Sequence, residues 1–152
     1  VSRGTLGDQR MSLQHLEDEI VRERYRDPRI HAALNCASVG CPRLPRRAFA
    51  GATLAGDLDA AMREFVARER HCRIDAAERT VWLSKIFDWF ENDFLDEERR
   101  RGTPSPTTVA YINRYRPREA QIPTGFRVRF LDYDKRLNRQ QTGASYARPD
   151  TP

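Results

Sequence analysis

The chain has 152 residues, of which 39% are hydrophobic and 32% charged, with 27 lysines and arginines against 22 aspartates and glutamates. This length fits one domain that buries a core without metal or disulfide staples, and no run approaches the roughly 18 apolar residues of a membrane span. The net charge of +5 comes mostly from arginines dispersed in mixed-sign runs. Since no zinc-finger spacing, RNA-recognition pattern or basic zipper accompanies it, we expect no nucleic-acid partner.

The N-terminus and the cysteine count leave the compartment open. Val1 is neither a start methionine nor part of a signal peptide, so we expect a processed or truncated start. Three cysteines are too few for a disulfide scaffold, and their odd number leaves at least one thiol unpaired. A protein without a membrane span, either cytoplasmic or exported, agrees with both observations.

The first predicted helix follows Ser12, a candidate N-cap, because apolar residues recur behind it at helical spacing. It should end before Asp27 and Pro28, since a residue that precedes proline is pushed out of the helical region. The apolar run 30–34 has the length of a buried strand. Residues 42–51, with two prolines, three arginines and a glycine, predict a loop.

The second half of the chain alternates between helical and strand patterns. Thr53 is a candidate cap for the clearest helix, because residues 54–66 carry an apolar stripe. Residues 71–75 and 80–84 predict a hairpin. Three further elements complete the pattern: a helix capped by Ser84 and ending before Gly102, a helix from Ser105 and Pro106 to about Tyr115, and a half-buried strand over 126–130.

These elements predict an α+β fold of about four helices with three or four short strands in a single compact domain. We expect that domain to span residues 5–138. The composition turns polar after Asn138, so residues 139–152 predict a disordered tail.

Candidate chemistry concentrates between two prolines, in residues 28–42. Cys36 and Cys41 bracket four small residues, which favour a tight turn whose backbone N–H groups lower a thiol pKa and bind an oxyanion. His31 lies five residues before Cys36, and a histidine near a thiolate is the minimal activated nucleophile.

Other interpretations of these side chains stay open. Free cysteine is among the most buried residue types, so either thiol suits an inert core position. In an exported protein Cys36 and Cys41 suit a disulfide. His31 and both cysteines, with His71 or Cys72, suit a metal site, but the spacing matches no familiar zinc knuckle. We therefore expect no metal and no cofactor.

Several segments together resemble the domain-of-unknown-function family numbered 547. The resemblance covers roughly residues 5–138 in order, and family members occur in bacteria and in plants. It points to a set of motif residues: His31, Cys36, Cys41, Trp89, Asp93, Tyr133, Asp134 and Asn138.

The chain departs from the family pattern at two positions. Gly40 stands where the family typically has serine, and Lys135 where it commonly has tryptophan. The family domain also usually begins with an Asn-x-Tyr-Asn segment that does not precede Val1. The resemblance therefore predicts the C-terminal portion of that domain.

Two functions agree with these residues. One is a thiol-dependent hydrolase or group transferase acting on a small molecule or peptide. Cys36 or Cys41 would be its nucleophile, His31 its base, and Asp134 or Asn138 the orienting group. The other is a non-catalytic protein-interaction domain in which these residues have a structural role. Family membership alone does not decide between them.

Overall fold

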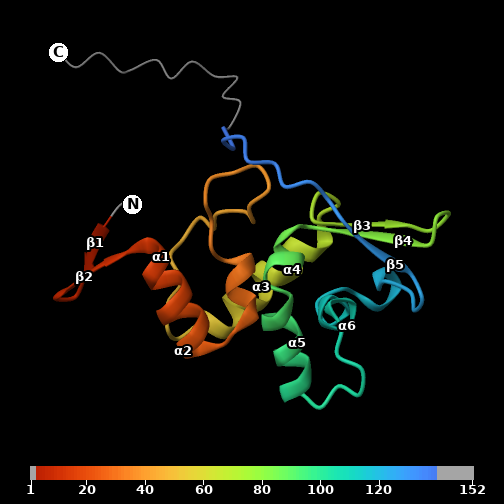
Figure 1. Cartoon of the computed structure of the whole chain (residues 1–152), viewed down its shortest axis with the longest axis horizontal. Helices are drawn as coiled ribbons and strands as arrows, with labels where there is room; N and C mark the ends of the chain where they lie inside the picture. The colour runs from red at the N-terminus through yellow and green to blue at the C-terminus, as the bar shows by residue number, and fades with distance from the viewer. Residues whose placement is uncertain (1–2, 140–152) are drawn as a thin grey trace.

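A computed structural model describes residues 3–139 of the chain as a mixed α+β fold (Figure 1). The predicted fold class is confirmed. The predicted tail lies outside the described residues except for Arg139. The elements in chain order are β1 (Arg3–Leu6), β2 (Gln9–Ser12), α1 (Leu13–His15), η1 (Leu16–Arg22), α2 (Glu23–Tyr25), η2 (Pro28–Ala32), α3 (Leu54–Ala67), β3 (Cys72–Asp75), β4 (Thr80–Leu83), α4 (Ile86–Trp89), α5 (Glu91–Arg100), α6 (Thr108–Asn113), η3 (Arg118–Ala120) and β5 (Arg127–Phe130).

A three-stranded sheet lies at one side of the molecule, with the order β3-β4-β5. β3 and β4 form the predicted hairpin, with Cys72 opposite Leu83. β5 pairs with the other edge of β4 in parallel, with Leu83 opposite Phe130. Alternation in 126–130 predicted this last strand correctly, but Val128 is exposed rather than packed inward.

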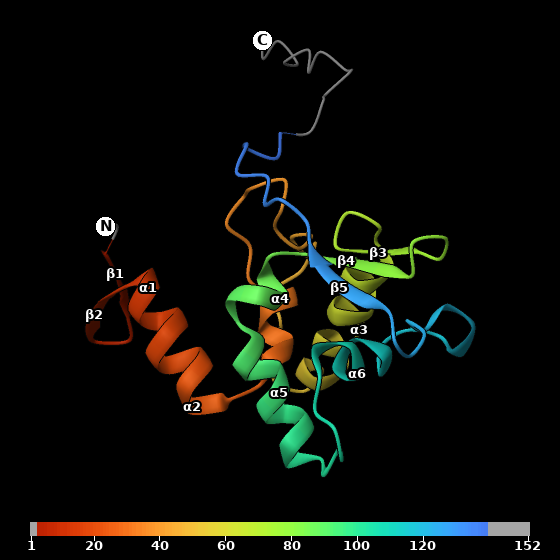
Figure 2. The same cartoon turned by 45° about the vertical axis from the view of Figure 1, so that its right-hand side comes forward.

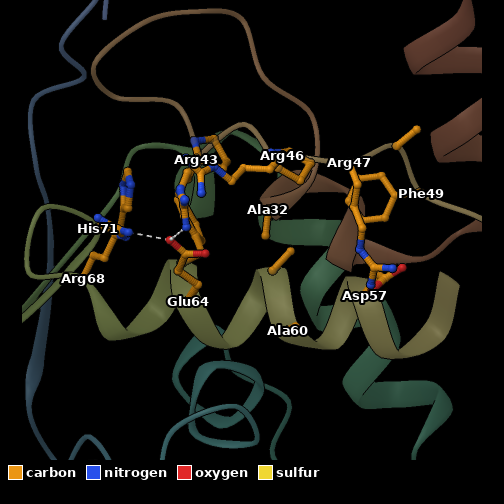
Figure 3. A pocket seen from close by; sticks show the side chains of 15 residues that line it. Ala32, Arg43, Arg46, Arg47, Phe49, Asp57, Ala60, Glu64, Arg68 and His71 are labelled. Carbon is orange, nitrogen blue, oxygen red and sulfur yellow. Dashed lines mark hydrogen bonds and ion pairs between the residues drawn. The ribbon is translucent and has the colours of Figure 1, made fainter. Parts of the chain in front are cut away.

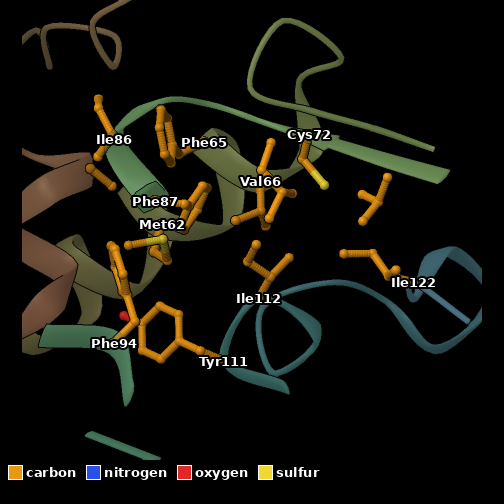
Figure 4. Close-up of a cluster of buried hydrophobic side chains, with 13 residues drawn as sticks. Met62, Phe65, Val66, Cys72, Ile86, Phe87, Phe94, Tyr111, Ile112 and Ile122 are labelled. Atoms are coloured by element: carbon orange, nitrogen blue, oxygen red, sulfur yellow. The ribbon is translucent and has the colours of Figure 1, made fainter. Parts of the chain in front are cut away.

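The core fills the space between this sheet and helices α3, α5 and α6 (Figure 4). The apolar stripe of 54–66 forms its centre, which confirms that helix. Burial of large apolar side chains is the main favourable term in such a core. The best-buried members are Met62, Phe65, Val66, Val81, Leu83, Phe87, Phe94, Tyr111 and Ile112.

The N-terminal segment forms a separate arm beside this core (Figure 2). β1 and β2 make a hairpin whose turn includes Gly7 at a φ of 63°, a conformation that glycine adopts without strain. Ser12 caps the following helix as predicted, since its Oγ accepts a hydrogen bond from the backbone N–H of His15 at 3.0 Å. Arg26, at a left-handed φ of 51°, ends the helical path before Asp27.

The strand predicted over residues 30–34 is wrong, because Pro28–Ala32 is a short 3-10 helix. Asp27 is its N-cap and accepts a hydrogen bond from the backbone N–H of Arg29 at 3.0 Å. Pro28 presets the backbone angle of the first helical residue. This cap and proline outweigh an alanine-rich run that has little intrinsic preference for a strand.

Two predicted helix caps and one predicted continuous helix also differ from the structure. Thr53 precedes α3 but makes no side-chain capping bond. The helix predicted from Ser84 to Gly102 breaks at Phe90, whose φ and ψ of −116° and 26° separate α4 from α5. Thr107, not Ser105, caps α6 through a 3.0 Å bond from the N–H of Ala110.

Buried ion pairing joins α5 to α6. Glu98 is fully buried, and its carboxylate accepts hydrogen bonds from Arg114 and from the hydroxyl of Thr103 at 2.7 Å. These bonds are needed because burying a carboxylate without hydrogen-bond partners would lower the stability of the fold. Among the helices of residues 3–139, none is both long and apolar enough to cross a bilayer.

Met62→Ala should lower the free energy of unfolding by about 2–4 kcal/mol, because it removes a buried side chain and leaves a cavity. Met62 is 0% exposed, whereas Leu54 on the same helix is 42% exposed. Leu54→Ala is the matched control and should cost less than about 1 kcal/mol. Urea unfolding of the two variants measures this difference, and equal losses would contradict the placement of the core.

Candidate functional site

The 3-10 helix η2 carries His31 into the protein interior. Arg29 follows the N-cap Asp27 and Pro28. Its guanidinium donates to the Asp59 carboxylate of α3 at 2.8 Å, and this bond fixes η2 against that helix. On the inner side of the turn, His31 is buried. Its ring stacks on Phe90 with 4.1 Å between centroids and meets Phe94 at a tilt, with 5.4 Å between centroids.

His31 and Asp93 form a partly buried hydrogen-bonded pair. The Nε2 of His31 lies 2.7 Å from Oδ2 of Asp93, so the imidazole donates to the carboxylate. Arg22, from the N-terminal helical segment, donates to the same carboxylate at 3.1 and 3.4 Å. The Asp93 carboxylate of α5 thus joins two neighbouring N-terminal elements, η1 and η2, that lie more than 60 residues before it in the sequence.

The charges around Asp93 keep it ionised. Burial acts to raise the pKa of this carboxyl, but the hydrogen bonds from His31 and Arg22 outweigh that effect and lower it below its usual value of 3.8. The guanidinium of Arg22 also lies over the Phe90 ring, 4.7 Å from its centroid.

Cys36 and Cys41 are joined by a disulfide in this structure, which realises the pairing that the sequence left open for an exported protein. Asn35 holds the start of the loop. Its Oδ1 accepts from the backbone N–H of Ala37 at 2.7 Å, and its amide donates to the carbonyl of Pro42. Ala37 has a φ of 61°, so the loop turns through a conformation that non-glycine residues seldom adopt.

The loop is fastened to the chain segment that follows β5. The N–H groups of Val39 and Gly40 donate to the carbonyls of Arg136 and Asp134, each at 2.9 Å. In return, the N–H of Asn138 donates to the carbonyl of Ala37 at 2.8 Å. This pairing brings residues 131–139 alongside the disulfide.

Tyr133 contacts both sulfur atoms. Its hydroxyl lies 3.2 Å from the Sγ of Cys36 and 3.2 Å from the Sγ of Cys41. Burial raises the pKa of Tyr133, so the hydroxyl keeps its proton and donates to the disulfide. A Cβ at Gly40 would lie 2.9 Å from the Tyr133 ring, which explains why serine does not fit at this position in this chain.

The two sulfur-bearing residues occupy different environments. Cys36 is exposed, whereas Cys41 is 2% exposed. The Sγ of Cys41 also has a second donor, because the backbone N–H of Cys36 points to it at 3.0 Å. The Tyr133 hydroxyl is equally near both sulfurs, so the contact that distinguishes the Sγ of Cys41 is the Cys36 N–H. The Sγ of Cys36 lies 3.3 Å from the Ser38 hydroxyl.

A pocket of about 380 Å³ opens beside the disulfide, and we call it the disulfide pocket. Trp89 forms part of its wall, is 49% exposed, and packs on Tyr133 with 4.8 Å between ring centroids. Glu17, His31 and Asn35 contribute polar side chains to the lining, beside the two cysteines of the disulfide. The apolar part comes from the N-terminal segment and from α4 and its neighbours, namely Leu13, Leu16, Val21, Leu34, Ile86 and Phe90.

The structure brings some of the predicted site residues together and separates others. His31, Cys36 and Cys41 line one pocket, but no hydrogen bond joins the described His31 side chain to either sulfur. Asp134 accepts from Arg136 instead, and these hydrogen bonds lower the pKa of its carboxyl to about 2. Asn138 reaches the loop through its backbone N–H.

Cys36 and Cys41, from the set that suggested a metal site, are bonded to each other. Within residues 3–139, no group of three or more histidine, cysteine or acidic side chains has an arrangement that could hold a metal ion. The third cysteine, Cys72, is buried in the core, and burial raises the pKa of its thiol.

Residues that the sequence reasoning missed are Asn35, which braces the loop, and Arg22, which completes the Asp93 cluster. Asn35 had one available signal, because an asparagine beside a tight turn commonly bonds to the backbone two residues on. Arg22 had none, since its partner lies 71 residues away.

Comparison with known proteins finds one similarity. The sequence model of a family described as "Protein of unknown function, DUF547" matches residues 2–66, which confirms the predicted resemblance over the N-terminal part of the chain. The match includes His31, Cys36 and Cys41, while Trp89, Asp93 and the motif residues after β5 lie beyond it. No curated protein and no solved structure matches the chain.

Asp93→Asn should lower the free energy of unfolding by about 1–3 kcal/mol at pH 7, because it weakens bonds to two partners. The pKa of Asp93 is lower in the folded protein than its usual 3.8. The stability that the ionised carboxylate contributes is therefore complete above pH 3.8 and is lost as the pH falls through the pKa of the folded state. Urea unfolding at pH 7 and at lower pH values measures it. The exposed Asp96→Asn is the control, and equal effects of both variants would refute the cluster.

Gly40→Ser should destabilise the protein by about 1–3 kcal/mol, because the new Cβ overlaps the ring of Tyr133. Gly51→Ser is the control, since nothing lies within 4 Å of a Cβ placed there. Thermal unfolding compares them. A neutral effect of Gly40→Ser would mean that the loop does not approach Tyr133 as closely as described.

Proposed function

We propose that this protein, whose residues 2–66 match the DUF547 family, oxidises substrate thiols by thiol–disulfide exchange at Cys36–Cys41. The substrate is a thiol-bearing small molecule or peptide that enters the disulfide pocket. The observation that carries the proposal is the difference between the two sulfurs. Cys36 is an exposed residue, whereas Cys41 is buried and its Sγ has a backbone N–H donor, that of Cys36, at 3.0 Å.

The chemical step uses only atoms that the protein and substrate supply. A substrate thiolate attacks the Sγ of Cys36, a new S–S bond forms there, and the Cys36–Cys41 bond breaks with its electron pair passing to Cys41. A second substrate thiolate then attacks the mixed disulfide and releases Cys36 as a thiolate. The substrate thiols are oxidised to a disulfide, and the protein disulfide is reduced to two thiols.

Hydrogen bonds at Cys41 favour this direction of attack. Exchange is faster when the leaving sulfur is a better thiolate, and it depends on which sulfur the attacking group can reach. The Tyr133 hydroxyl and the Cys36 N–H lie 3.2 and 3.0 Å from Cys41, where negative charge develops as the bond breaks. A hydrogen-bond donor lowers the barrier when it bonds more strongly to the charge of the transition state than to the uncharged sulfur of the starting disulfide.

We favour exchange over hydrolysis because exchange starts from the disulfide and needs no base. A hydrolytic route would need a free thiolate beside the imidazole of His31, and the Nε2 of that ring is bonded to Asp93. In this proposal His31 is a positioning residue, because its bond to Asp93 fixes η2, which precedes the disulfide loop. Asp134 and Asn138 hold the loop through backbone hydrogen bonds.

A second candidate is a non-catalytic interaction domain in which the motif has a structural role. The buried His31, stacked on Phe90 and bonded to Asp93, favours it. The disulfide would then serve to close the loop, and the pocket would hold an apolar side chain of a protein partner beside the exposed Trp89. The two candidates differ in how the folded disulfide reacts.

Two variants, each lacking one cysteine of the disulfide, test exchange directly. Cys41→Ser leaves the exposed Cys36, and Cys36→Ser leaves the buried Cys41. With glutathione disulfide, we expect Cys41→Ser to form a mixed disulfide roughly ten times faster than Cys36→Ser, because only Cys36 is accessible. Intact-mass spectrometry follows both reactions.

Cys72 serves as an internal control for folding. It is buried in the core, so in a folded variant it resists alkylation. Equal rates for the two variants, with Cys72 still protected, would refute exchange. A wild-type disulfide that resists dithiothreitol until Cys72 becomes reactive would instead support the structural role.

Tyr133→Phe should slow reduction of the oxidised protein by glutathione roughly fivefold to tenfold, since one hydrogen bond of about 1 kcal/mol to the departing Cys41 is lost. Tyr25→Phe is the control, because Tyr25 is exposed and lies outside the disulfide pocket. Both rates are measured by quenching the reaction at set times and labelling the thiols that have been released. An unchanged rate in Tyr133→Phe would remove the proposed role of the hydroxyl.

A further inference from the structure

A second pocket, of about 330 Å³, lies on the other side of Pro42, between the loop of residues 42–51 and helix α3 (Figure 3). We call it the arginine pocket. Its volume falls in the range of small-molecule sites. Neither the Cys36–Cys41 chemistry nor the family resemblance gives it a role, so any ligand it binds is independent of the proposed function.

Four arginines line the arginine pocket, three on the loop and one at the end of α3. Figure 3 shows the loop arginines along one side and the helix side chains along the other. The acidic side chains of the lining are Asp57 and Glu64. The lining therefore has two more positive than negative charges.

The two carboxylates are already paired. Glu64 accepts from Arg68 and, at 3.4 Å, from Arg43. Asp57 accepts from Arg47 at 2.5 Å and from the hydroxyl of Thr53 at 2.7 Å. Hydrogen bonding from Arg68 lowers the pKa of Glu64, so this acid stays ionised near neutral pH.

Arg46 is the unmatched cation of the set. It lines the pocket, but it has no hydrogen bond or ion pair with any of the residues 3–139. Its guanidinium is free to bond to an incoming anion in the two-point geometry that arginine provides. Arg43, which shares Glu64 with Arg68, has donors to spare as well.

Apolar side chains line both sides of the arginine pocket and form its apolar wall. Phe49, on the loop, and Ala60, Ala61 and Phe65, on α3, contribute it. Phe49 and Ala60 lie on opposite sides of the space in Figure 3. A ligand that carries charge alone would leave this wall without a partner, whereas a ligand with an apolar body would cover it.

His71 provides a further polar group at the pocket. It is buried, and burial with the charges of Arg70 and Arg68 lowers its pKa to about 3, so the ring is neutral. Nε2 accepts from Arg70 at 3.0 Å, which leaves the ring proton on Nδ1. That N–H has no acceptor among the described residues, and buried polar groups are normally bonded.

We infer that the arginine pocket binds a small organic anion with an apolar body. The anionic headgroup pairs with Arg46 and Arg43, and the apolar body packs between Phe49 and α3. Carboxylate and phosphate headgroups share this chemistry, since the arginine fork matches both. The excess of positive charge and the unpaired guanidinium favour an anion, and the apolar wall favours one with an apolar body.

Nuclear magnetic resonance titration of the full chain tests this inference with four probes. Phenyl phosphate and benzoate carry an aromatic body with either headgroup, inorganic phosphate lacks the body, and benzyl alcohol lacks the charge. We expect backbone amide shifts in residues 43–49 and 57–64 with one or both aromatic anions. Inorganic phosphate and benzyl alcohol should bind at least fivefold more weakly.

Variants then identify the site. Arg46→Gln should weaken binding of the tighter aromatic anion roughly tenfold, because it removes a charged two-point contact without breaking an ion pair of the fold. Arg118→Gln makes the same charge change at an exposed residue outside the pocket and should leave the affinity within twofold. Phe49→Ala should weaken the aromatic anions while leaving inorganic phosphate unchanged.

Comparison of the aromatic anions distinguishes the headgroups. Tighter binding of benzoate assigns a carboxylate ligand, and tighter binding of phenyl phosphate assigns a phosphate ester. Equal losses in Arg46→Gln and Arg118→Gln would overturn the inference, since they would reflect the net charge of the protein alone. Benzyl alcohol that binds as tightly as the anions, or the absence of shifts in residues 43–49, would overturn it too.

Discussion

The contact between Tyr133 and the Cys36–Cys41 disulfide is the constraint on which the site depends. It joins residues 97 and 92 positions apart, and three backbone hydrogen bonds between the loop and the segment after β5 support it. The close approach requires glycine at residue 40. Because the segment covers one side of the loop, Cys41 is buried while Cys36 stays open. The difference between the two sulfurs follows from this packing and not from the cysteine spacing.

His31 makes contacts in the fold that its sequence neighbourhood does not suggest. A histidine five residues before a cysteine resembles half of a catalytic pair. In the fold it is a buried connector, stacked on Phe90 and bonded to Asp93, and Arg22 extends the connection to the N-terminal arm. This cluster fixes η2, from which the disulfide loop departs. The motif therefore combines the disulfide loop with the side chains that support it.

Sequence reasoning succeeded where local pattern decides structure. The stripe of 54–66 and the hairpin of 71–84 were predicted correctly, because periodicity alone determines which face is buried. Residues 30–34 were predicted wrongly, since the Asp27 cap and Pro28 outweigh an ambiguous apolar run. The contacts of Tyr133, Arg22 and Gly40 could not be predicted, because each depends on a partner in a distant segment. The same holds for the arginine pocket, whose cations meet α3 only after folding.

Pro42 lines both pockets, of which one lies beside the disulfide and apolar residues, and the other beside four arginines that include the unmatched Arg46. The central claim is that the folded protein reacts through Cys36 with Cys41 as the leaving sulfur. Peptide mapping by mass spectrometry, after quenching oxidised wild-type protein during its reaction with glutathione, tests it most directly. We predict the glutathione adduct on Cys36 while Cys72 remains unlabelled. An adduct on Cys41, or none until Cys72 becomes reactive, would contradict the account.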